Sequence, residues 1–476
     1  MAATLLTPDI CVIGAGAGGM AVAAAAATFR APVVLVEQSK MGGEHLNYGC
    51  VPSKELLAVA RRFADLKNLP GFGIGVENPQ IDFAVVRAHV QDAIRAVSPN
   101  SSAERFAGLG VQVVLGSAQF TDHETIAVGD DIVIKARRTV IATGSSPATP
   151  LMPGLDTVEF LNNETIFDLA ERPDHLIVIG AGTVGLEFAQ AFRRFGAAVS
   201  VIEARTPLGG EDPECVDVVL AALMRDGIAV HAGATVKGVA KTDTGVAVTF
   251  ETPGGVQTVV GSHLLITAGR RPNIEALNLQ AAGIKFDANG IIVNRHLRTS
   301  NKSVYAVGDV AGGPRLTNAA TYHAGLVARN ALFRTSDKAD DTIIPRVTFT
   351  DPELAHVGIS EAEAHKKHRK VHILRWSYHD NDRAQIERAP QGHIKVIADK
   401  NGTILSATIV GAQAGEMISL WALAIAQKLN IRSIAELVAP YPTLSDISKR
   451  IAINFYAPSV KSSFLQRVIA WLRWWG

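Results

Sequence analysis

A glycine-rich segment near residue 14 has the residue types and spacing of a dinucleotide-binding turn. The apolar run Ile10–Ile13 is followed by Gly14, Gly16 and Gly19, and a second apolar run ends at Glu37. Glycines at these positions let the backbone turn sharply and approach a pyrophosphate, while the following helix offers N–H donors at its N-terminus. The acid can accept a hydrogen bond from a ribose hydroxyl. This segment therefore predicts one dinucleotide site.

The same pattern occurs a second time after the apolar run His175–Ile179. Its glycines and its terminal acid are Gly180, Gly182, Gly185 and Glu203. In both copies the acid follows the first glycine by 23 positions. A single glycine turn is weak support for a dinucleotide site, but a repeat with matching strands, helix and acid is strong support. The sequence therefore predicts two bound dinucleotides.

The end of the second copy bears on which nicotinamide dinucleotide binds. An acid at Glu203 favours a free ribose 2′-hydroxyl, and hence NADH. Arg205 stands two positions later and leaves NADPH open as an alternative.

The sequence contains three cysteines, and one of them has a setting that suits chemistry. Cys50 stands shortly before Pro52, which suits the first turn of a helix, and a helix N-terminus favours the thiolate. Cys11 lies within an apolar strand and Cys215 on an expected helix over residues 213–224, so we expect both to be buried and structural. His45 and Cys50 together fall short of a closed zinc site, and we expect no bound metal.

Composition limits the classes of protein that the chain can belong to. A chain of 476 residues with 47% hydrophobic residues predicts about three domains. The formal net charge of +1 offers no basic field for nucleic acid. Few cysteines, no export signal and no apolar stretch of about 20 residues predict a cytoplasmic protein. The histidines at positions 356, 365, 368 and 372 predict a solvated basic face rather than a metal site.

Four further segments carry a resemblance to a known family. They are Met41–Lys54, Ile141–Gly144, Ala268–Asn273 and Ser303–Val310. In this order they resemble the motifs of the class I pyridine nucleotide-disulfide oxidoreductases, which include dihydrolipoamide dehydrogenase, glutathione reductase and mercuric reductase. The resemblance covers nearly the whole chain.

The resemblance implies an α/β fold with two doubly wound dinucleotide-binding domains and a C-terminal α+β dimerisation domain. It places an FAD-binding domain at residues 1–148 and 274–342, an NAD(P)-binding domain at 149–273 and the dimerisation domain at 343–458. Residues 459–476 form a separate tail. A homodimer is expected.

The resemblance also implies roles for individual residues. The first repeat binds FAD and the second binds the nicotinamide dinucleotide. Lys54 and Glu187 form an ion pair beside flavin N5, where a cation stabilises the negative charge of a reduced flavin. Asp309 bonds the flavin ribitol, and a helix that opens near Thr317 points its N-terminus at the flavin. The expected cofactor-binding residues are Gly14, Gly16, Gly19, Glu37, Gly43, Lys54, Ala118, Thr143, Gly144, Gly308, Asp309, Thr317, Gly180, Gly182, Gly185, Glu203 and Gly269.

Two positions depart from the family pattern. His45 stands where the family has the first cysteine of its redox pair, and Cys50 matches the second, flavin-side cysteine. Tyr441 stands where the family has its acid–base histidine, within Ala439–Asp446. A phenol with a reference pKa of about 10 is a poorer proton shuttle near neutrality than an imidazole at about 6.5. Both departures affect one half-reaction, and a two-cysteine relay of electrons to a disulfide is chemically impossible without the first thiol.

These features predict an FAD-dependent NAD(P)H oxidoreductase that passes electrons from reduced flavin to a small, non-disulfide acceptor. A quinone is the first candidate, and oxygen, a dye-like molecule or a metal ion stay open. One alternative is a peroxide or persulfide reductase that cycles Cys50 alone. Another is a redox sensor or assembly subunit that keeps both dinucleotides as ligands.

The tail carries an amphipathic pattern. Its apolar residues on one helical face are Phe464, Leu465, Val468, Ile469, Leu472 and Trp475, and its polar residues on the other are Gln466, Arg467 and Arg473. This pattern suits the bilayer interface, but docking on another subunit or a partner would use it as well. Peripheral contact with the inner membrane surface is therefore one expectation for the tail.

Overall fold

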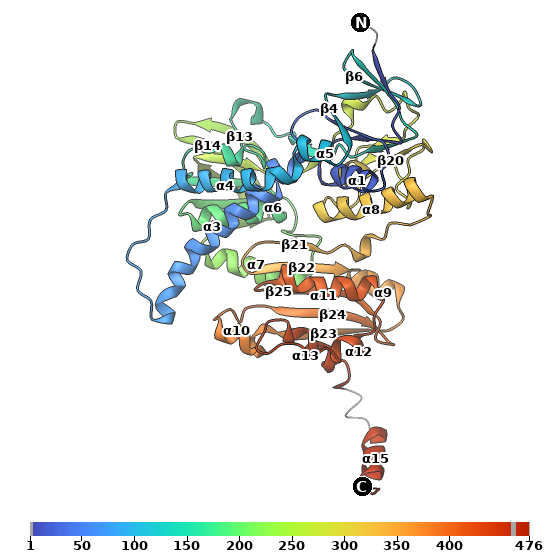
Figure 1. Ribbon diagram of the computed structural model, residues 1–476. Coiled ribbons are helices and arrows are strands. Elements are labelled where there is room, and N and C mark those ends of the chain that lie inside the picture. Colours follow the sequence, from blue (N-terminus) through green and yellow to red (C-terminus); the bar gives the residue numbers. More distant parts are fainter. Residues whose placement is uncertain (1–2, 458–462, 476) are drawn as a thin grey trace. The chain divides into compact units, whose positions relative to one another are not determined.

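The computed structural model describes residues 3–457 and 463–475, and its contacts divide the chain into two units (Figure 1). The first unit consists of Met1–Arg205 and Ala229–Asp341, and the second consists of Thr206–Ile228 and Thr342–Gly476. The domain boundaries that the sequence suggests stay a prediction.

The first unit contains a parallel sheet built around the first glycine turn. Its strand order is β20 (Val304–Ala306), β8 (Arg138–Ile141), β2 (Ile10–Ile13), β3 (Val33–Glu37) and β4 (Val111–Leu115). Every residue of β2 and β3 is buried, as expected for strands covered on both faces.

Different elements cover the two faces of this sheet. Helices α1 (Ala17–Thr28) and α8 (Thr317–Phe333) pack together on one face, where they share a core with Val12 and Leu35 (Figure 1). The other face shares a core with a mixed four-stranded sheet. The strands of that sheet, in order, are β1 (Thr4–Leu6), β7 (Ile132–Lys135), β6 (Thr125–Val128) and β5 (Ala118–Phe120).

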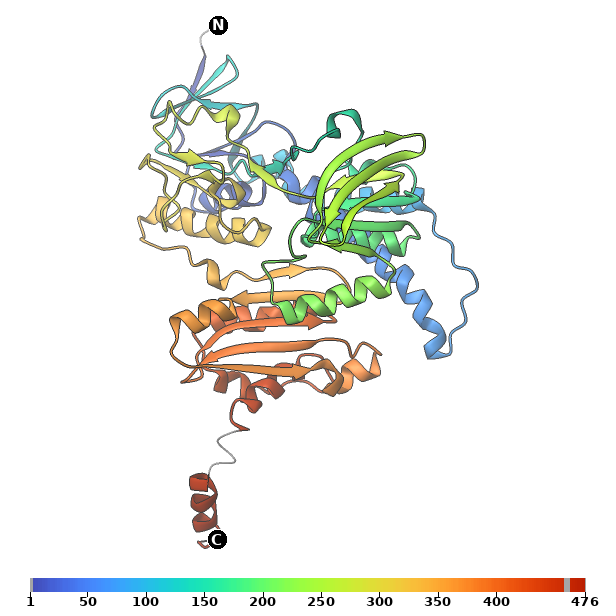
Figure 2. The ribbon, with the colours of Figure 1, turned by 180° about the vertical axis from the view of Figure 1, so that it is seen from behind.

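The second glycine turn lies in another parallel sheet of the same unit. Its strands are β12 (Ala229–Ala232), β11 (Ala198–Glu203), β10 (His175–Ile179) and β16 (His263–Ile266). Helix α6 (Thr183–Arg194) follows β10 as α1 follows β2. An antiparallel sheet completes this part of the unit, with strands β13 (Thr235–Thr242), β14 (Gly245–Thr252) and β15 (Gly255–Gly261) (Figure 2).

Two helices carry the segment that resembles the family's redox motif. Helix α2 (Gly43–Asn47) contains His45, and α3 (Cys50–Asn68) begins at Cys50. Helix α3 packs against α6 and α4 (Phe83–Val97), so the redox segment is braced against the second dinucleotide-binding motif. The two-stranded sheet of β9 (Ser145–Pro147) and β17 (Arg270–Pro272) lies in the same unit.

The second unit is an antiparallel sheet with helices. Its strand order is β21 (Arg346–Thr348), β22 (Glu353–Gly358), β25 (Ile404–Gly411), β24 (His393–Asp399) and β23 (Val371–Ser377). The α-helices of this unit within the described residues are α7 (Pro213–Arg225), α9 (Glu361–Lys367), α10 (Asp382–Ile386), α11 (Ala414–Ala426), α12 (Ile431–Ala435), α13 (Asp446–Asn454) and α15 (Ser463–Leu472). Helix α7 packs on β22 and β25, and Cys215 of this helix is fully buried as expected.

The expectation of a solvated basic face is wrong for His356. Its side chain is only 5% exposed in β22, and its Nδ1 lies 2.8 Å from the Thr408 hydroxyl on the paired strand β25. Alternating strand residues face opposite sides of a sheet, so a histidine in the middle of a central strand can point into the core. His365 is exposed, as expected.

Candidate active site

The two glycine turns have the same local geometry. Gly14 has a φ of +102° and Gly180 a φ of +108°, a backbone region that favours glycine. A Cβ atom at Gly19 would lie 1.9 Å from the Gly14 carbonyl oxygen, and one at Gly185 would lie 2.0 Å from that of Gly180. Each helix therefore packs directly on its own turn, which only glycine permits.

The middle glycine of each turn faces open space. A Cβ atom at Gly16 or at Gly182 would meet no described atom within 4 Å. Both residues are N-caps, so the first N–H groups of α1 and α6 are directed toward this space. Gly43 lies against the first turn, because a Cβ atom added at Gly43 would lie 2.7 Å from the Gly16 Cα. Both turns therefore fit a dinucleotide pyrophosphate, in which anionic oxygens accept these donors.

The terminal acids are held in the same way in both repeats. In the first, Glu37 Oε2 accepts a hydrogen bond of 2.6 Å from the Ala15 N–H. In the second, Glu203 Oε2 accepts one of 2.8 Å from the Ala181 N–H. Each carboxylate oxygen keeps a further lone pair. Both acids could therefore bind a ribose hydroxyl while they brace the turn.

The structure brings Cys50 and Thr317 together. The Cys50 Sγ lies 3.3 Å from the Thr317 Oγ1, and these residues open α3 and α8. Cys50 is exposed, whereas Cys11 and Cys215 are buried. The N-terminal ends of two long helices therefore meet beside an accessible thiol, where their N–H groups favour negative charge.

Lys54 and Glu187 form the predicted ion pair. The Lys54 Nζ donates a hydrogen bond of 2.7 Å to Glu187 Oε2, and the Glu187 side chain is only 3% exposed. Lys54 lies one turn after Cys50 in α3, and Glu187 lies in α6 after the second glycine turn. The pair therefore joins the redox segment to the second repeat and holds a cation at a fixed position.

His45 lies on α2, in a largely buried position. Burial lowers the pKa of His45, so the imidazole is neutral near neutral pH. Its buried Nδ1 makes no hydrogen bond to any residue that the structure describes. A Cβ at Gly49 would lie 3.2 Å from the His45 Cα, so the chain folds back tightly between residues 45 and 50.

A polar network beside His45 was not predicted from the sequence. Glu44 pairs with Arg270 and accepts a hydrogen bond of 2.9 Å from the Asn163 amide. The Arg270 Nε donates to the Ser145 hydroxyl at 2.8 Å, and this hydroxyl donates to Asp309 Oδ2 at 2.6 Å. Burial raises the pKa of Glu44, and the Arg270 guanidinium opposes that effect. The network links the redox segment to the acid predicted to bind the flavin ribitol.

The remaining predicted positions of the first unit lie on strand ends and turns. The Thr143 hydroxyl donates a hydrogen bond of 2.7 Å to the Asn273 carbonyl, which fixes the backbone beside Gly144. Positive φ angles occur at Gly144, Gly269 and Gly308. Ala118 is buried in β5.

Tyr441 belongs to the second unit. Its hydroxyl donates a hydrogen bond of 2.7 Å to Asp382 Oδ2, and the side chain is 70% exposed. This hydrogen bond raises the pKa of Tyr441, which keeps the phenol protonated at neutral pH. Asp382 was not predicted as its partner.

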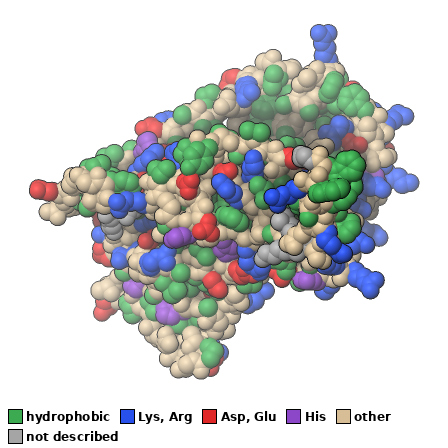
Figure 3. All heavy atoms as spheres, turned by 90° about the horizontal axis from the view of Figure 1, so that it is seen from below, with side chains coloured by type: hydrophobic (Ala, Val, Ile, Leu, Met, Phe, Trp, Pro, Cys, Tyr) green, Lys and Arg blue, Asp and Glu red, His purple; other side chains and the backbone are tan. Residues whose placement is uncertain are grey.

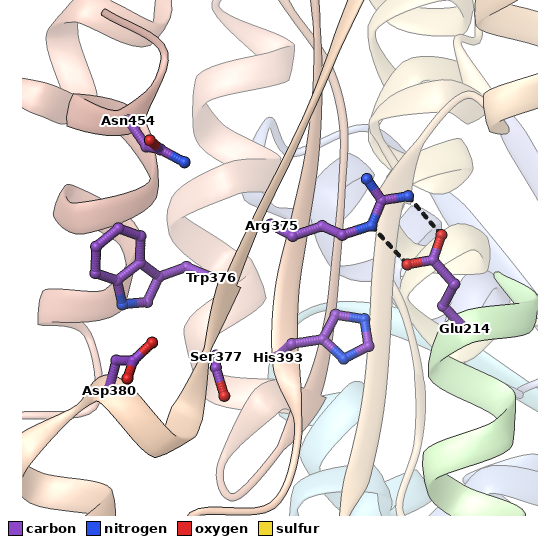
Figure 4. Close-up of a pocket in the computed structure, with 7 residues that line it drawn as sticks. All are labelled: Glu214, Arg375, Trp376, Ser377, Asp380, His393 and Asn454. Atoms are coloured by element: carbon purple, nitrogen blue, oxygen red, sulfur yellow. Dashed lines mark hydrogen bonds and ion pairs between the residues drawn. The ribbon is translucent and has the colours of Figure 1, made fainter. Parts of the chain in front are cut away.

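The second unit also contains a pocket of about 420 Å³ (Figure 4). It is lined by Glu214, Arg375, Trp376, Ser377, Asp380, His393 and Asn454. Arg375 makes paired hydrogen bonds of 2.6 and 2.5 Å to Glu214, so its guanidinium is already engaged by a carboxylate. Among the described residues, no group of three or more His, Cys, Asp or Glu side chains could hold a metal ion.

Comparison with known proteins identifies the family. Residues 8–324 match the pyridine nucleotide-disulphide oxidoreductase family, and residues 344–451 match its dimerisation domain. The chain is 34% identical over 462 residues to the mercuric reductase of Streptomyces lividans, covering 96% of this chain and 98% of the relative. It is 34% identical over 448 residues to the dihydrolipoyl dehydrogenase of Geobacillus stearothermophilus, covering 93% and 94%. The structure of LpdA from Mycobacterium tuberculosis aligns with a TM-score of 0.86 at 26% identity, covering 94% and 99%.

The chain belongs to the pyridine nucleotide-disulphide oxidoreductase family. The predicted fold class is confirmed, and so is the prediction of FAD and NAD(P)H, the cofactors that family members use. The chain is a flavoprotein oxidoreductase, and its dimerisation domain supports a homodimer. None of the helices in the described ranges is both long and apolar enough to cross a membrane.

Proposed function

We propose that this flavoprotein oxidises NADH and passes the electrons to an acceptor that is not a disulfide, with a quinone as the first candidate. The observation that carries this proposal is the imidazole of His45 where a disulfide-reducing site needs its first thiol. The other two cysteines offer no replacement, because Cys11 and Cys215 are both 0% exposed. Burial also raises the pKa of the Cys11 thiol to about 12, so it stays protonated.

Different residues of the chain would take part in the first half-reaction, the reduction of the flavin by NADH. The turns at Gly16 and Gly182 would hold the pyrophosphates of FAD and of NADH. Glu203 would bind the adenosine ribose of NADH. The bound flavin supplies the capacity to accept hydride and to release electrons. Lys54, fixed by Glu187 at 2.7 Å, would favour that transfer by placing a positive charge where negative charge develops.

The second half-reaction needs electrons and protons but no thiol. NADH, one proton and a quinone would yield NAD⁺ and a hydroquinone, which balances two electrons and two protons. Reduction of a disulfide releases a thiolate that must be protonated, and the Tyr441 phenol, whose hydrogen bond to Asp382 raises its pKa, is a poor proton donor for that step. Reduction of a quinone releases no thiolate, so it does not require this proton donor. This difference favours a quinone over a disulfide.

A specific observation favours a second candidate, a peroxide reductase that uses Cys50 alone. Cys50 is exposed at the start of α3 and lies 3.3 Å from the Thr317 hydroxyl. Its thiolate would attack a peroxide O–O bond and, with one proton from solvent, would give a sulfenic acid and an alcohol or water. Two electrons from NADH, with a proton, would then return the sulfenic acid to thiolate and release water.

We also infer that residues 459–476 contact the surface of a membrane, where a lipid-soluble quinone would be accessible to the enzyme. The domain boundaries at residues 148, 273 and 342 and the site assignments made from the sequence belong to the same proposal.

Anaerobic stopped-flow absorbance of the FAD-loaded protein tests both half-reactions. We expect rapid bleaching of the flavin by NADH, slower bleaching by NADPH, and reoxidation by menadione but not by lipoamide or glutathione disulfide. Rapid reoxidation by either disulfide would overturn the proposal. Reoxidation by peroxide alone would favour the second candidate, and no bleaching by either nucleotide would indicate a sensor or assembly subunit.

A further inference from the structure

Helix α15 presents a continuous apolar face. It spans Ser463–Leu472, and the backbone hydrogen bonds of Arg473, Trp474 and Trp475 extend its last turn. Large apolar side chains are exposed along it: Phe464, Ile469, Trp471, Leu472, Trp474 and Trp475. Figure 3, in which α15 points toward the viewer, shows apolar side chains gathered in one patch. At 3.6 residues per turn, Phe464, Val468 and Leu472 follow one another along this face.

The opposite side of the helix carries polar and basic side chains together with Trp474. At 100° per residue, Gln466 and Arg473 point away from Val468, and Arg467 borders the apolar face. The sequence from 455 to 476 contains Lys461, Arg467 and Arg473 and no aspartate or glutamate. All formal side-chain charge in this stretch is therefore positive.

Tryptophans are concentrated at one end of the helix. Of the five tryptophans in the chain, Trp471, Trp474 and Trp475 lie within five consecutive positions. The ring centroids of Trp471 and Trp475 are 5.8 Å apart. Tryptophan is enriched where an apolar ring and a polar N–H meet a lipid–water boundary. This distribution favours a bilayer interface over a uniformly apolar protein groove.

We propose that α15 lies flat in the headgroup region of an anionic phospholipid bilayer, with its apolar face inserted and its arginines among the lipid phosphates. This names the lipid class for the membrane contact proposed above and does not depend on which acceptor the flavin uses. A helix of this kind binds through buried apolar area together with attraction between basic side chains and anionic headgroups. Both contributions are required for the proposal.

Vesicle co-sedimentation of the full-length FAD-loaded protein tests the proposal without turnover. The vesicles are phosphatidylcholine alone or phosphatidylcholine mixed with phosphatidylglycerol. The variants are Val468→Asp on the apolar face and Gln466→Asp on the polar face, which add the same charge on opposite sides. We expect binding to the anionic vesicles, and we expect Val468→Asp to weaken it about tenfold more than Gln466→Asp does.

The electrostatic attraction of the arginines to the lipid and the insertion of the apolar face can be measured separately. Arg467→Gln with Arg473→Gln should weaken binding to the anionic vesicles, and added salt should do the same. Vesicles should shift the tryptophan emission of the parent protein to shorter wavelength, and this shift should vanish in Val468→Asp. Trp421 is fully buried and Trp376 is half-buried, so the three exposed tail tryptophans dominate this change.

Several outcomes would overturn the proposal. They are equal binding to both kinds of vesicle, equal effects of the two aspartate variants, or no binding at all. A change in oligomeric state on Val468→Asp without any vesicle binding would assign the face to a second copy of the chain instead. Vesicle binding by a protein that fails to reduce menadione would uphold the lipid contact and reject the quinone, so the two failures are distinguishable.

Discussion

The Cys50 Sγ lies 3.3 Å from the Thr317 Oγ1, although 267 positions separate these residues in the sequence. Each residue opens a helix, so the contact joins the N-termini of α3 and α8. Two helix N-termini and a hydroxyl donor create surroundings that stabilise negative charge. The same surroundings would serve a Cys50 thiolate or electron density on a bound flavin, and the two candidate functions differ in which of these matters.

Replacement of Cys50 separates the two functions. We expect Cys50→Ser to keep NADH–menadione turnover within about threefold of the parent, because the electrons would pass directly from flavin to quinone. Turnover with peroxide as acceptor should fall to background. Thr317→Val is the matched control, since it keeps the thiol and removes the hydroxyl at the same contact. Loss of menadione turnover in Cys50→Ser with normal flavin reduction would contradict the quinone proposal.

Removal of the Lys54 cation should slow the first half-reaction. Lys54→Met leaves the carboxylate of Glu187, which is 3% exposed, without this ammonium partner. We expect flavin reduction by NADH to slow about 10²-fold, a typical effect of losing one group that stabilises developing charge. Stopped-flow absorbance under anaerobic conditions measures this rate directly. The exposed Lys400→Met is the control, and an unchanged rate in Lys54→Met would remove this residue from the site.

The buried His356 should make stability depend on pH. Burial, assisted by Arg346, lowers the pKa of His356 to about 4, below its ordinary value. The unfolded chain therefore binds a proton that the folded chain excludes as pH falls below about 6.5, and stability is lost between that pH and about 4. The lowered pKa of His356 changes the free energy of unfolding by about 3 kcal/mol over this whole pH range. About 2 kcal/mol of this stability is lost between pH 7 and pH 5.

His356→Gln should remove this dependence. The free energy of unfolding, measured by urea titration, should fall less between the two pH values in the variant than in the parent. His379→Gln changes an exposed histidine and should leave the pH dependence of the parent unaltered. Equal pH dependence in His356→Gln and the parent would mean that another group dominates acid sensitivity.

The parts of the site that depend on local sequence could be predicted. The turns at Gly14 and Gly180 require glycine because of their own φ angles and the helix that packs on them. The helix that opens at Thr317 and the Lys54–Glu187 pair were also expected, but both expectations rested on family resemblance, and the pair joins residues 133 positions apart. Only the glycine turns were identified from spacing alone, because a short segment carries their whole pattern.

The parts that depend on long-range pairing could not be predicted. Glu44 and Arg270 are 226 positions apart, and neither has a spacing that points to the other. In the sequence, nothing distinguishes Lys395 from the other residues of its strand. In the structure its side chain is 2% exposed and forms ion pairs with three carboxylates, those of Asp212, Glu214 and Glu361. Such partners come from packing between distant segments. The strand pattern also gave no sign that His356 faces the core.

Restoring the two departures from the family pattern tests whether they alone block disulfide reduction. His45→Cys would place a thiol five positions before Cys50, where the chain folds back tightly. We expect an intramolecular disulfide in the oxidised variant, and titration with a thiol reagent should count two more thiols after reduction by NADH. The parent and Tyr441→His should show no such increase.

Adding Tyr441→His to His45→Cys should give measurable turnover with lipoamide. An imidazole with a reference pKa of about 6.5 exchanges protons with a thiol near neutral pH, whereas the phenol bonded to Asp382 does so poorly. We expect the double variant to exceed either single variant by at least about tenfold in lipoamide reduction, because each change supplies a step that the other needs. Cys50→Ser in the same background should abolish that turnover. A disulfide that forms and reduces normally, but supports no lipoamide turnover in the double variant, would show that residues other than 45 and 441 exclude disulfide substrates.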